Sequence, residues 1–169
     1  MLKTLRQIAS IGIVSEPPPQ ADEGLRLRDG LQDHIRAVLG RALCIRHIDA
    51  GSCNGCELEI HALGNAFYDL ERLGLRFVAS PRHADVLMVT GPVTLNMRQA
   101  LLRTWRATPD PKWVVAVGDC AVDGGLFAGS YAVAGGVDAV IPVDLHIRGC
   151  PPSPVQLLQG LLALLERVA

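Results

Sequence analysis

Two short runs of consecutive apolar residues restrict the fold of this chain more than any other feature. Residues 86–89 and 114–117 contain no polar side chain, whereas a strand with one face in water alternates apolar and polar residues. Both runs are therefore expected to form strands that helices cover on both faces, as in a parallel sheet. Because helical patterns separate runs of this kind along the chain, we infer a series of βαβ units.

Five strands and three helices can be placed along this pattern. The strand candidates are residues 43–48, 75–79, 86–90, 113–117 and 139–143. The helix candidates are residues 57–71, 96–107 and 154–168, the last with Ser153 as its N-cap and Pro154 at its first position. We therefore predict an α/β fold, a flavodoxin-like doubly wound parallel sheet with helices on both faces. In such a sheet the functional crevice lies at the carboxyl ends of the strands.

The beginning of the chain has a different pattern. We expect residues 1–41 to form an N-terminal amphipathic arm followed by a surface helix, and residues 42–169 to form the single α/β domain. Basic and apolar side chains recur at helical spacing in residues 1–13, and the prolines at 17–19 end that helix. A second helical pattern follows and is closed by Gly40.

Composition narrows the classes of function. The chain has 16 Lys and Arg against 17 Asp and Glu, a net charge of -1, so we expect no nucleic-acid partner. The longest uncharged stretches, residues 124–137 and 149–165, are interrupted by Gly, Pro or Gln and are too short to span a bilayer. The first residues do not have the pattern of a signal peptide. We therefore expect the protein to stay in the cytoplasm, where disulfides are rare.

Four of the five cysteines follow predicted strands. Cys53 and Cys56 lie after the first strand, Cys120 follows the fourth strand and Cys150 follows the fifth. Because the carboxyl ends of parallel strands meet at one edge of a sheet, we expect these four thiols to converge. Cys44 is different, since it lies inside an apolar strand, and we expect it to be a small buried side chain.

Thiols in this arrangement fit several kinds of site. The Cys-Asn-Gly-Cys loop at residues 53–56 is by itself compatible with zinc, a redox dithiol or an iron-sulfur cluster. A dithiol leaves Cys120 and Cys150 without a role, and structural zinc sites usually have two closely spaced ligand pairs. A 4Fe-4S cluster takes one thiolate on each iron, which suits one pair and two single ligands. The residues alone favour the cluster and leave zinc, or no metal, open.

Residues beside the cysteines add to this interpretation. Glycines precede or follow Cys120 and Cys150, and backbone close to a cluster needs small residues with exposed N–H groups. Glu57 and Glu59 open the helix after the first pair, where the helix N-terminus already favours a carboxylate. A proton-transfer role for either glutamate stays open.

Several segments of the domain resemble a known family. Residues 45–60, residues 80–85 with 90–94, and residues 141–144 with 149–152 resemble the small subunit shared by energy-converting, membrane-bound (group 4) NiFe hydrogenases and respiratory complex I. In complex I, the NADH-quinone oxidoreductase, this is the 20 kDa subunit, and it carries two adjacent cysteines in the first loop. Because this chain has C-x-x-C there, it is most similar to the formate hydrogenlyase and hydrogenase-4 branch.

The resemblance implies an electron-transfer subunit. It implies one proximal 4Fe-4S cluster on the residues that match the family's ligands, which are Cys53, Cys56, Cys120 and Cys150. The chain would be a non-autonomous part of an oxidoreductase complex, because a nickel site needs two C-x-x-C pairs and this chain has one. Asp119 and residues 122–123 depart from the smaller or amide residues that are usual in relatives.

The resemblance also implies partners and a location. The partners are a hydrogenase large subunit or a complex I-like 49 kDa-type subunit, a ferredoxin-like iron-sulfur subunit, and a membrane subunit near the N-terminal arm. The apolar side of the arm suits packing on that membrane subunit or at the lipid interface. The location is peripheral, on the cytoplasmic side of the inner membrane. Two alternatives stay open: a complex I-like module that reduces quinone, and a zinc-stabilised binding domain without a redox role.

Overall fold

The computed structural model describes residues 40–168 and, before them, positions 2, 3, 6, 10, 35 and 37. Apart from those positions, the predicted arm and surface helix lie outside the described residues, and the division at residue 41 stays a prediction. Ile35 is helical and 2% exposed, and its side chain belongs to the core of the α/β domain.

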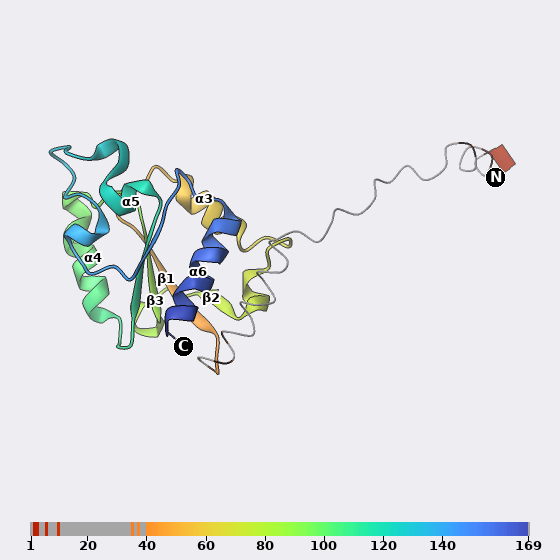
Figure 1. The fold of residues 1–169 in the computed structure, drawn as a ribbon, viewed down its shortest axis with the longest axis horizontal. Coiled ribbons are helices and arrows are strands. Elements are labelled where there is room, and N and C mark those ends of the chain that lie inside the picture. The colour runs from red at the N-terminus through yellow and green to blue at the C-terminus, as the bar shows by residue number, and fades with distance from the viewer. Residues whose placement is uncertain are drawn as a thin grey trace.

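Five parallel strands form one sheet (Figure 1). They are β1 (Leu43–Asp49), β2 (Leu75–Phe77), β3 (Val86–Thr90), β4 (Trp113–Val117) and β5 (Leu145–Ile147). Their order across the sheet is β2-β1-β3-β4-β5, and every neighbouring pair is parallel. This is the flavodoxin-like order, so the predicted fold class is confirmed.

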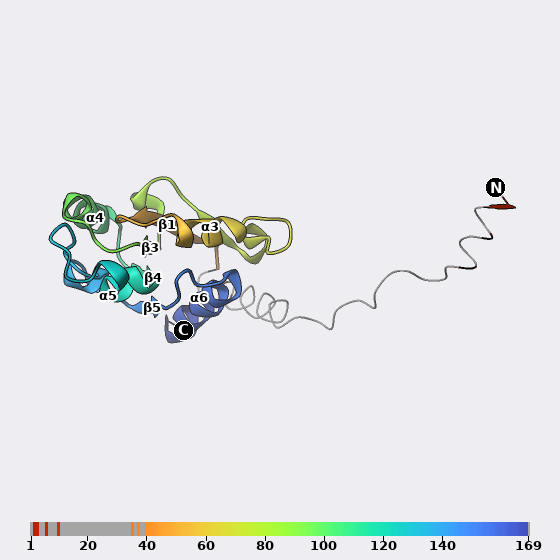
Figure 2. The ribbon, with the colours of Figure 1, turned by 90° about the horizontal axis from the view of Figure 1, so that it is seen from above.

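Helices cover both faces of this sheet (Figure 2). The α-helices of the domain are α3 (Gly55–Ala62), α4 (Leu95–Ala107), α5 (Asp119–Asp123) and α6 (Pro154–Val168). α3 and α6 pack on one face, and α4 and α5 pack on the other. In β3, Val86 and Met88 belong to the first core, whereas Leu87 and Val89 belong to the second. The uninterrupted apolar runs are thus explained by strands that are buried on both faces.

The fifth strand lies later in the chain than predicted. The strand predicted at residues 139–143 is wrong, because that segment begins in a short 3-10 helix and Ile141 packs in the core with α4 and α5. Pairing with β4 begins at Asp144, whose N–H donates to the Val114 carbonyl at 2.9 Å. The Asp144 carboxylate also accepts from the Val114 N–H at 2.7 Å. The predicted strand fails because Pro142 lacks the N–H that a sheet ladder needs.

The helix predicted at residues 57–71 is divided into two pieces. α3 ends at Ala62, and a 3-10 helix follows at Leu70–Leu73. Between them, the Asn65 side chain accepts from two backbone N–H groups at 2.8 and 2.9 Å, which stabilises a turn. α6, in contrast, spans the predicted residues. Ser153 is its N-cap as predicted, because the Ser153 hydroxyl accepts from a backbone N–H in the first turn of α6.

The buried and exposed sides of α4 give a direct test of core packing. Leu101, on α4, is fully buried, whereas Leu95, on the same helix, is 51% exposed. We expect Leu101→Ala to lower the free energy of unfolding by about 2–5 kcal/mol, because it leaves a cavity in the core. Leu95→Ala should change it by about 0.5 kcal/mol or less. Denaturant unfolding of both variants measures this, and equal losses would contradict the assignment of the buried face of α4.

Candidate functional site

The four cysteines predicted to converge follow the carboxyl ends of β1, β4 and β5. The helices α3 and α5 begin at this edge of the sheet (Figure 1). Cys53 lies in the loop after β1, and Cys56 lies in the first turn of α3. Cys120 is the second residue of α5, and Cys150 lies in the loop after β5. Cys53 and Cys150 are exposed, whereas Cys56 and Cys120 are half-buried.

One hollow of about 110 Å³, here called the cysteine hollow, joins these residues. It is lined by Ser52, Cys53, Gly55, Cys56, Gly91, Pro92, Asp119, Cys120, Phe127, Gly149, Cys150 and Pro151. Cys44 does not line it and is 5% exposed within β1. Within residues 40–168 and the few earlier positions described, no three His, Cys, Asp or Glu side chains are placed to hold a single metal ion. The four thiols are instead arranged around a space.

Glycine backbone lies directly against two of the sulfurs. A Cβ atom on Gly118 would lie 2.6 Å from the Cys56 Sγ, and one on Gly125 would lie 2.9 Å from the Cys120 Sγ. Both glycines also have positive φ angles, 87° and 49°, which other residues rarely adopt. The backbone of Leu126 acts against the rise in the pKa of Cys120. The residues at these positions therefore leave room beside the two sulfurs.

Burial and mutual repulsion keep the two half-buried thiols protonated. The pKa of Cys56 is raised to about 12, first by burial and then by the charges of Glu57 and the other cysteines. The pKa of Cys120 is also raised, by burial and then by Cys150 and Cys53. Thiolates in one place repel each other unless a cation neutralises them. Metal binding at this site would therefore release protons.

The loop that carries Cys53 is held by its own hydrogen bonds. Asp49 Oδ1 accepts from two backbone N–H groups, at 2.8 and 2.7 Å. Ser52 Oγ accepts from the N–H of Asn54 at 3.0 Å and donates to Glu57 Oε2 at 2.5 Å. These bonds within the protein fix the first cysteine pair relative to β1 without any contribution from a ligand.

Glu57, in the first turn of α3, is 7% exposed and links three elements. Its carboxyl group accepts from the hydroxyls of Ser52 and Thr90, the last residue of β3. His47 Nε2, on β1, lies 2.9 Å from Thr90 Oγ1 and 3.6 Å from Glu57 Oε1. Burial lowers the pKa of His47, although the charge of Glu57 opposes this shift. The buried polar groups therefore satisfy one another and join α3 to β1 and β3.

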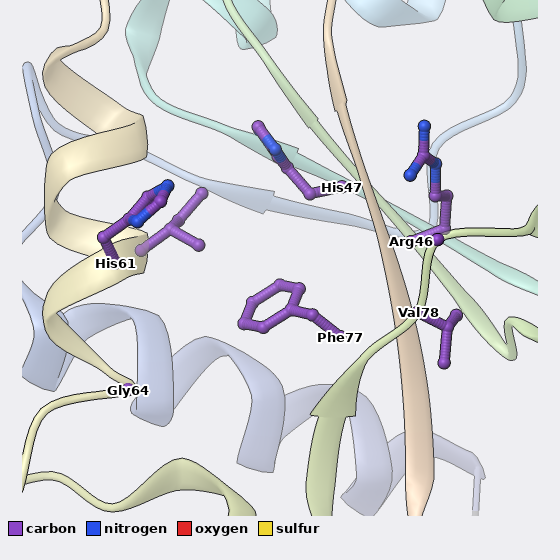
Figure 3. Close-up of a pocket in the computed structure, with 8 residues that line it drawn as sticks. Arg46, His47, His61, Gly64, Phe77 and Val78 are labelled. Atoms are coloured by element: carbon purple, nitrogen blue, oxygen red, sulfur yellow. The ribbon is translucent and has the colours of Figure 1, made fainter.

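His47 also faces a second and larger hollow, of about 450 Å³, between α3 and the strands β1 and β2 (Figure 3). Figure 3 shows the side chains of His47, His61 and Phe77 around one open space. None of the four cysteines lines this hollow. Of the residues that contact Glu57, His47 lines this larger hollow and Ser52 lines the cysteine hollow.

The structure brings together all four cysteines that the sequence singles out, and it buries Cys44 as expected. That the four bind a cluster stays a prediction. Sequence reasoning did not find Ser52 and Thr90 as the partners of Glu57. A usable signal existed for Thr90, because it is the one polar residue of an otherwise apolar strand and lies at its carboxyl end.

The fold and the site define a class, a parallel α/β domain with thiols gathered at the ends of its strands. Residues 53–164 match the family described as "NADH ubiquinone oxidoreductase, 20 Kd subunit". The chain belongs to this family. The resemblance drawn from the sequence is therefore confirmed.

Individual relatives add detail. The chain is 47% identical over 153 residues to formate hydrogenlyase subunit 7 of Escherichia coli K12, a match that covers 89% of this chain and 59% of that protein. This chain thus spans about three-fifths of the length of that relative. It is 44% identical over 131 residues to a probable membrane-bound hydrogenase subunit of Pyrococcus furiosus, covering 78% of each. An uncharacterized protein of Methanocaldococcus jannaschii is 48% identical over 122 residues, covering 72% of this chain and 82% of that protein.

Chains of two solved structures superpose on the fold of this chain. A chain of the membrane-bound sulfane sulfur reductase, an archaeal respiratory membrane complex, superposes with a TM-score of 0.67 at 34% identity, covering 87% of this chain and 76% of that one. A chain of an NAD+-reducing [NiFe]-hydrogenase shares the fold, with a TM-score of 0.58 at 20% identity, covering 75% and 93%. In the part of our chain that the structure describes, no helix is long and apolar enough to cross a bilayer.

The exposure of the thiols and the raised pKa of Cys56 predict how the cysteines react in the protein without bound metal. At about pH 8, iodoacetamide should label the exposed Cys53 and Cys150 first, and Cys56 and the buried Cys44 slowly. Because the pKa of Cys56 is about 12, its labelling rate should still rise about tenfold per pH unit above pH 8. Peptide mass spectrometry after timed pulses measures each site, with the unfolded chain as the control in which all five react. Equal rates for Cys53 and Cys56 would contradict the described burial.

Proposed function

We propose that this chain is the electron-transfer subunit of a membrane-associated NiFe-hydrogenase-like complex. It holds one proximal 4Fe-4S cluster on Cys53, Cys56, Cys120 and Cys150 and relays electrons to or from the active site of a large partner subunit. The observation that carries this proposal is the meeting of four thiols, from three separate segments, around one hollow. When bound, such a cluster supplies single-electron transfer.

The residues present fit this group. Four thiols provide one ligand for each iron of a cubane cluster. Gly118 and Gly125 leave space where any larger residue would meet a sulfur atom. The backbone of Leu126 favours the charged form of Cys120, which is the form that ligates a metal. Membership of the family described as "NADH ubiquinone oxidoreductase, 20 Kd subunit" supports the same assignment.

The chain's own residues have two tasks in this function. The hydrogen bonds among Asp49, Ser52 and Glu57 orient the first cysteine pair, so that little rearrangement is needed on binding. Gly118 and Gly125 leave room beside the sulfurs of the half-buried Cys56 and Cys120. Both tasks favour electron transfer, because a site that is already organised needs little reorganisation.

The surface beside the hollow is suited to a protein partner. Leu126 and Tyr131 are 92% and 96% exposed, and the half-exposed Phe127 lines the hollow itself. Cys53 and Cys150 are exposed at the same edge. Exposed apolar residues in one region mark interaction surfaces. We assign this surface to the large subunit, of the hydrogenase or complex I-like 49 kDa type.

The remaining partners follow from the proposed complex. The relatives named above include a membrane-bound hydrogenase subunit and a chain of a respiratory membrane complex, which supports a peripheral position at a membrane. We place the chain on the cytoplasmic side of the inner membrane, next to a ferredoxin-like iron-sulfur subunit. The N-terminal arm is assigned to contact with a membrane subunit. In this arrangement the chain is a non-autonomous subunit of an oxidoreductase.

A complex I-like role in quinone reduction is the second candidate, and the family description favours it. The formate hydrogenlyase and hydrogenase relatives, at 47% and 44% identity, favour the hydrogenase role. The two candidates differ in the metal of the large subunit. Nickel analysis of the complex isolated through this chain tests the first candidate, since nickel supports the hydrogenase role and its absence contradicts that role.

Replacing single cysteines tests the ligand set. Cys53→Ala, Cys56→Ala, Cys120→Ala and Cys150→Ala should each remove or convert the electron paramagnetic resonance (EPR) signal of the reduced cluster, because one iron loses its thiolate. Cys44→Ala is the matched control and should keep the signal, since Cys44 is buried in β1 and does not line the hollow. Iron and acid-labile sulfide are measured on the same anaerobic samples.

Two results would overturn this assignment. A full cluster signal after Cys150→Ala would reject the ligand set. Zinc without acid-labile sulfide in the intact chain would instead support a zinc-stabilised domain with no redox role.

A further inference from the structure

Three charged side chains lie beside the second pair of cysteines. Asp119 directly precedes Cys120 and is the one charged residue among the described residues that line the cysteine hollow. Asp123 ends the same helix, α5. Arg148 follows β5 and lies two positions before Cys150. We call Asp119, Asp123 and Arg148 the charged clamp.

The charged clamp joins α5 to the loop that carries Cys150. The Asp119 N–H donates to the Gly149 carbonyl at 2.9 Å, and Asp119 Oδ1 accepts from the Gly149 N–H at 3.1 Å. Arg148 Nη1 donates to Asp123 Oδ2 at 3.1 Å and lies 3.9 Å from Asp119 Oδ1. The two segments that supply Cys120 and Cys150 are therefore held together by side chains of opposite charge.

We propose that the charged clamp sets the reduction potential of the cluster, with Asp119 lowering it and Arg148 raising it. This inference rests on the proposed function. Reduction adds one electron to the cluster, so a nearby negative charge disfavours the reduced form and a positive charge favours it. Water screens these charges at an exposed surface, and a partner that covers the hollow strengthens their effect.

The hydrogen bonds make Asp119 a positioning residue as well as a charge. Its carboxylate fixes Gly149, the residue before Cys150, so its loss would loosen the fourth ligand. The two effects can be separated by choice of variant. Asp119→Asn keeps an oxygen that can accept from the Gly149 N–H but removes the charge, whereas Asp119→Ala removes both. Arg148→Gln removes the positive charge and keeps a donor.

The test is a redox titration followed by EPR on the full chain, purified anaerobically with its cluster. Asp119→Asn should shift the reduction potential upward, and Arg148→Gln should shift it downward. Asp119→Ala should also shift it upward and should lower the fraction of chains that hold a complete cluster. Matched charge controls are Arg106→Gln and Glu166→Gln, which lie near the far ends of α4 and α6, away from the cysteines (Figure 1).

Opposite shifts in Asp119→Asn and Arg148→Gln support the proposal, because a purely structural role would not move the potential in two directions. Shifts no larger than those of the two controls, or shifts of the same sign, overturn it. If Asp119→Ala does not fold, the two charge-neutralising variants still decide the matter. An intact chain without iron and sulfide contradicts the proposed function instead, and this failure is seen before any variant is titrated.

Discussion

The parallel pairing of β1, β3 and β4 is the interaction on which the rest of the structure depends. Asp49, Thr90 and Val117 are paired across these strands, so the three strands end level with one another. The segments that leave β1 and β4 therefore open at the same edge with Cys53, Cys56 and Cys120, and β5, whose Ile147 pairs with Val117, brings Cys150 to that edge. Because a shift of one residue would turn every side chain of a strand to the other face, the two buried cores also fix this alignment.

At that edge the site is made mostly of backbone and small side chains. Close approach of Gly118 to Cys56, and of Gly125 to Cys120, allows the sulfurs to lie near main-chain atoms. Polar side chains stand behind this inner layer. Glu57 is the clearest example, because this residue is only 7% exposed and two hydroxyl donors hold its carboxyl group in place. The backbone and small side chains thus leave space beside the sulfurs, and the polar side chains behind them hold the site rigid.

Much of this arrangement could be predicted from the sequence, because its physical causes are local. The apolar runs of β3 and β4 gave both strands correctly, since burial on two faces leaves a clear pattern. The run at residues 139–143 was misleading, because a connecting segment that packs Ile141, and in part Val140 and Val143, on the second core has the same apolar composition as a strand. The partners of Glu57 were missed, since Ser52 and Thr90 are brought to it only by the tertiary fold.

The cysteine hollow has a further consequence for the order in which the chain folds. Cys53 and Cys56 belong to one short segment with its own hydrogen bonds, so their loop can form with little loss of chain entropy. Cys150 reaches the same place only after β5, a strand of three residues at the edge of the sheet, has docked on β4. A chain with all four thiols in place is therefore a chain whose sheet is complete. In the proposed function, a complete ligand set therefore requires a complete sheet.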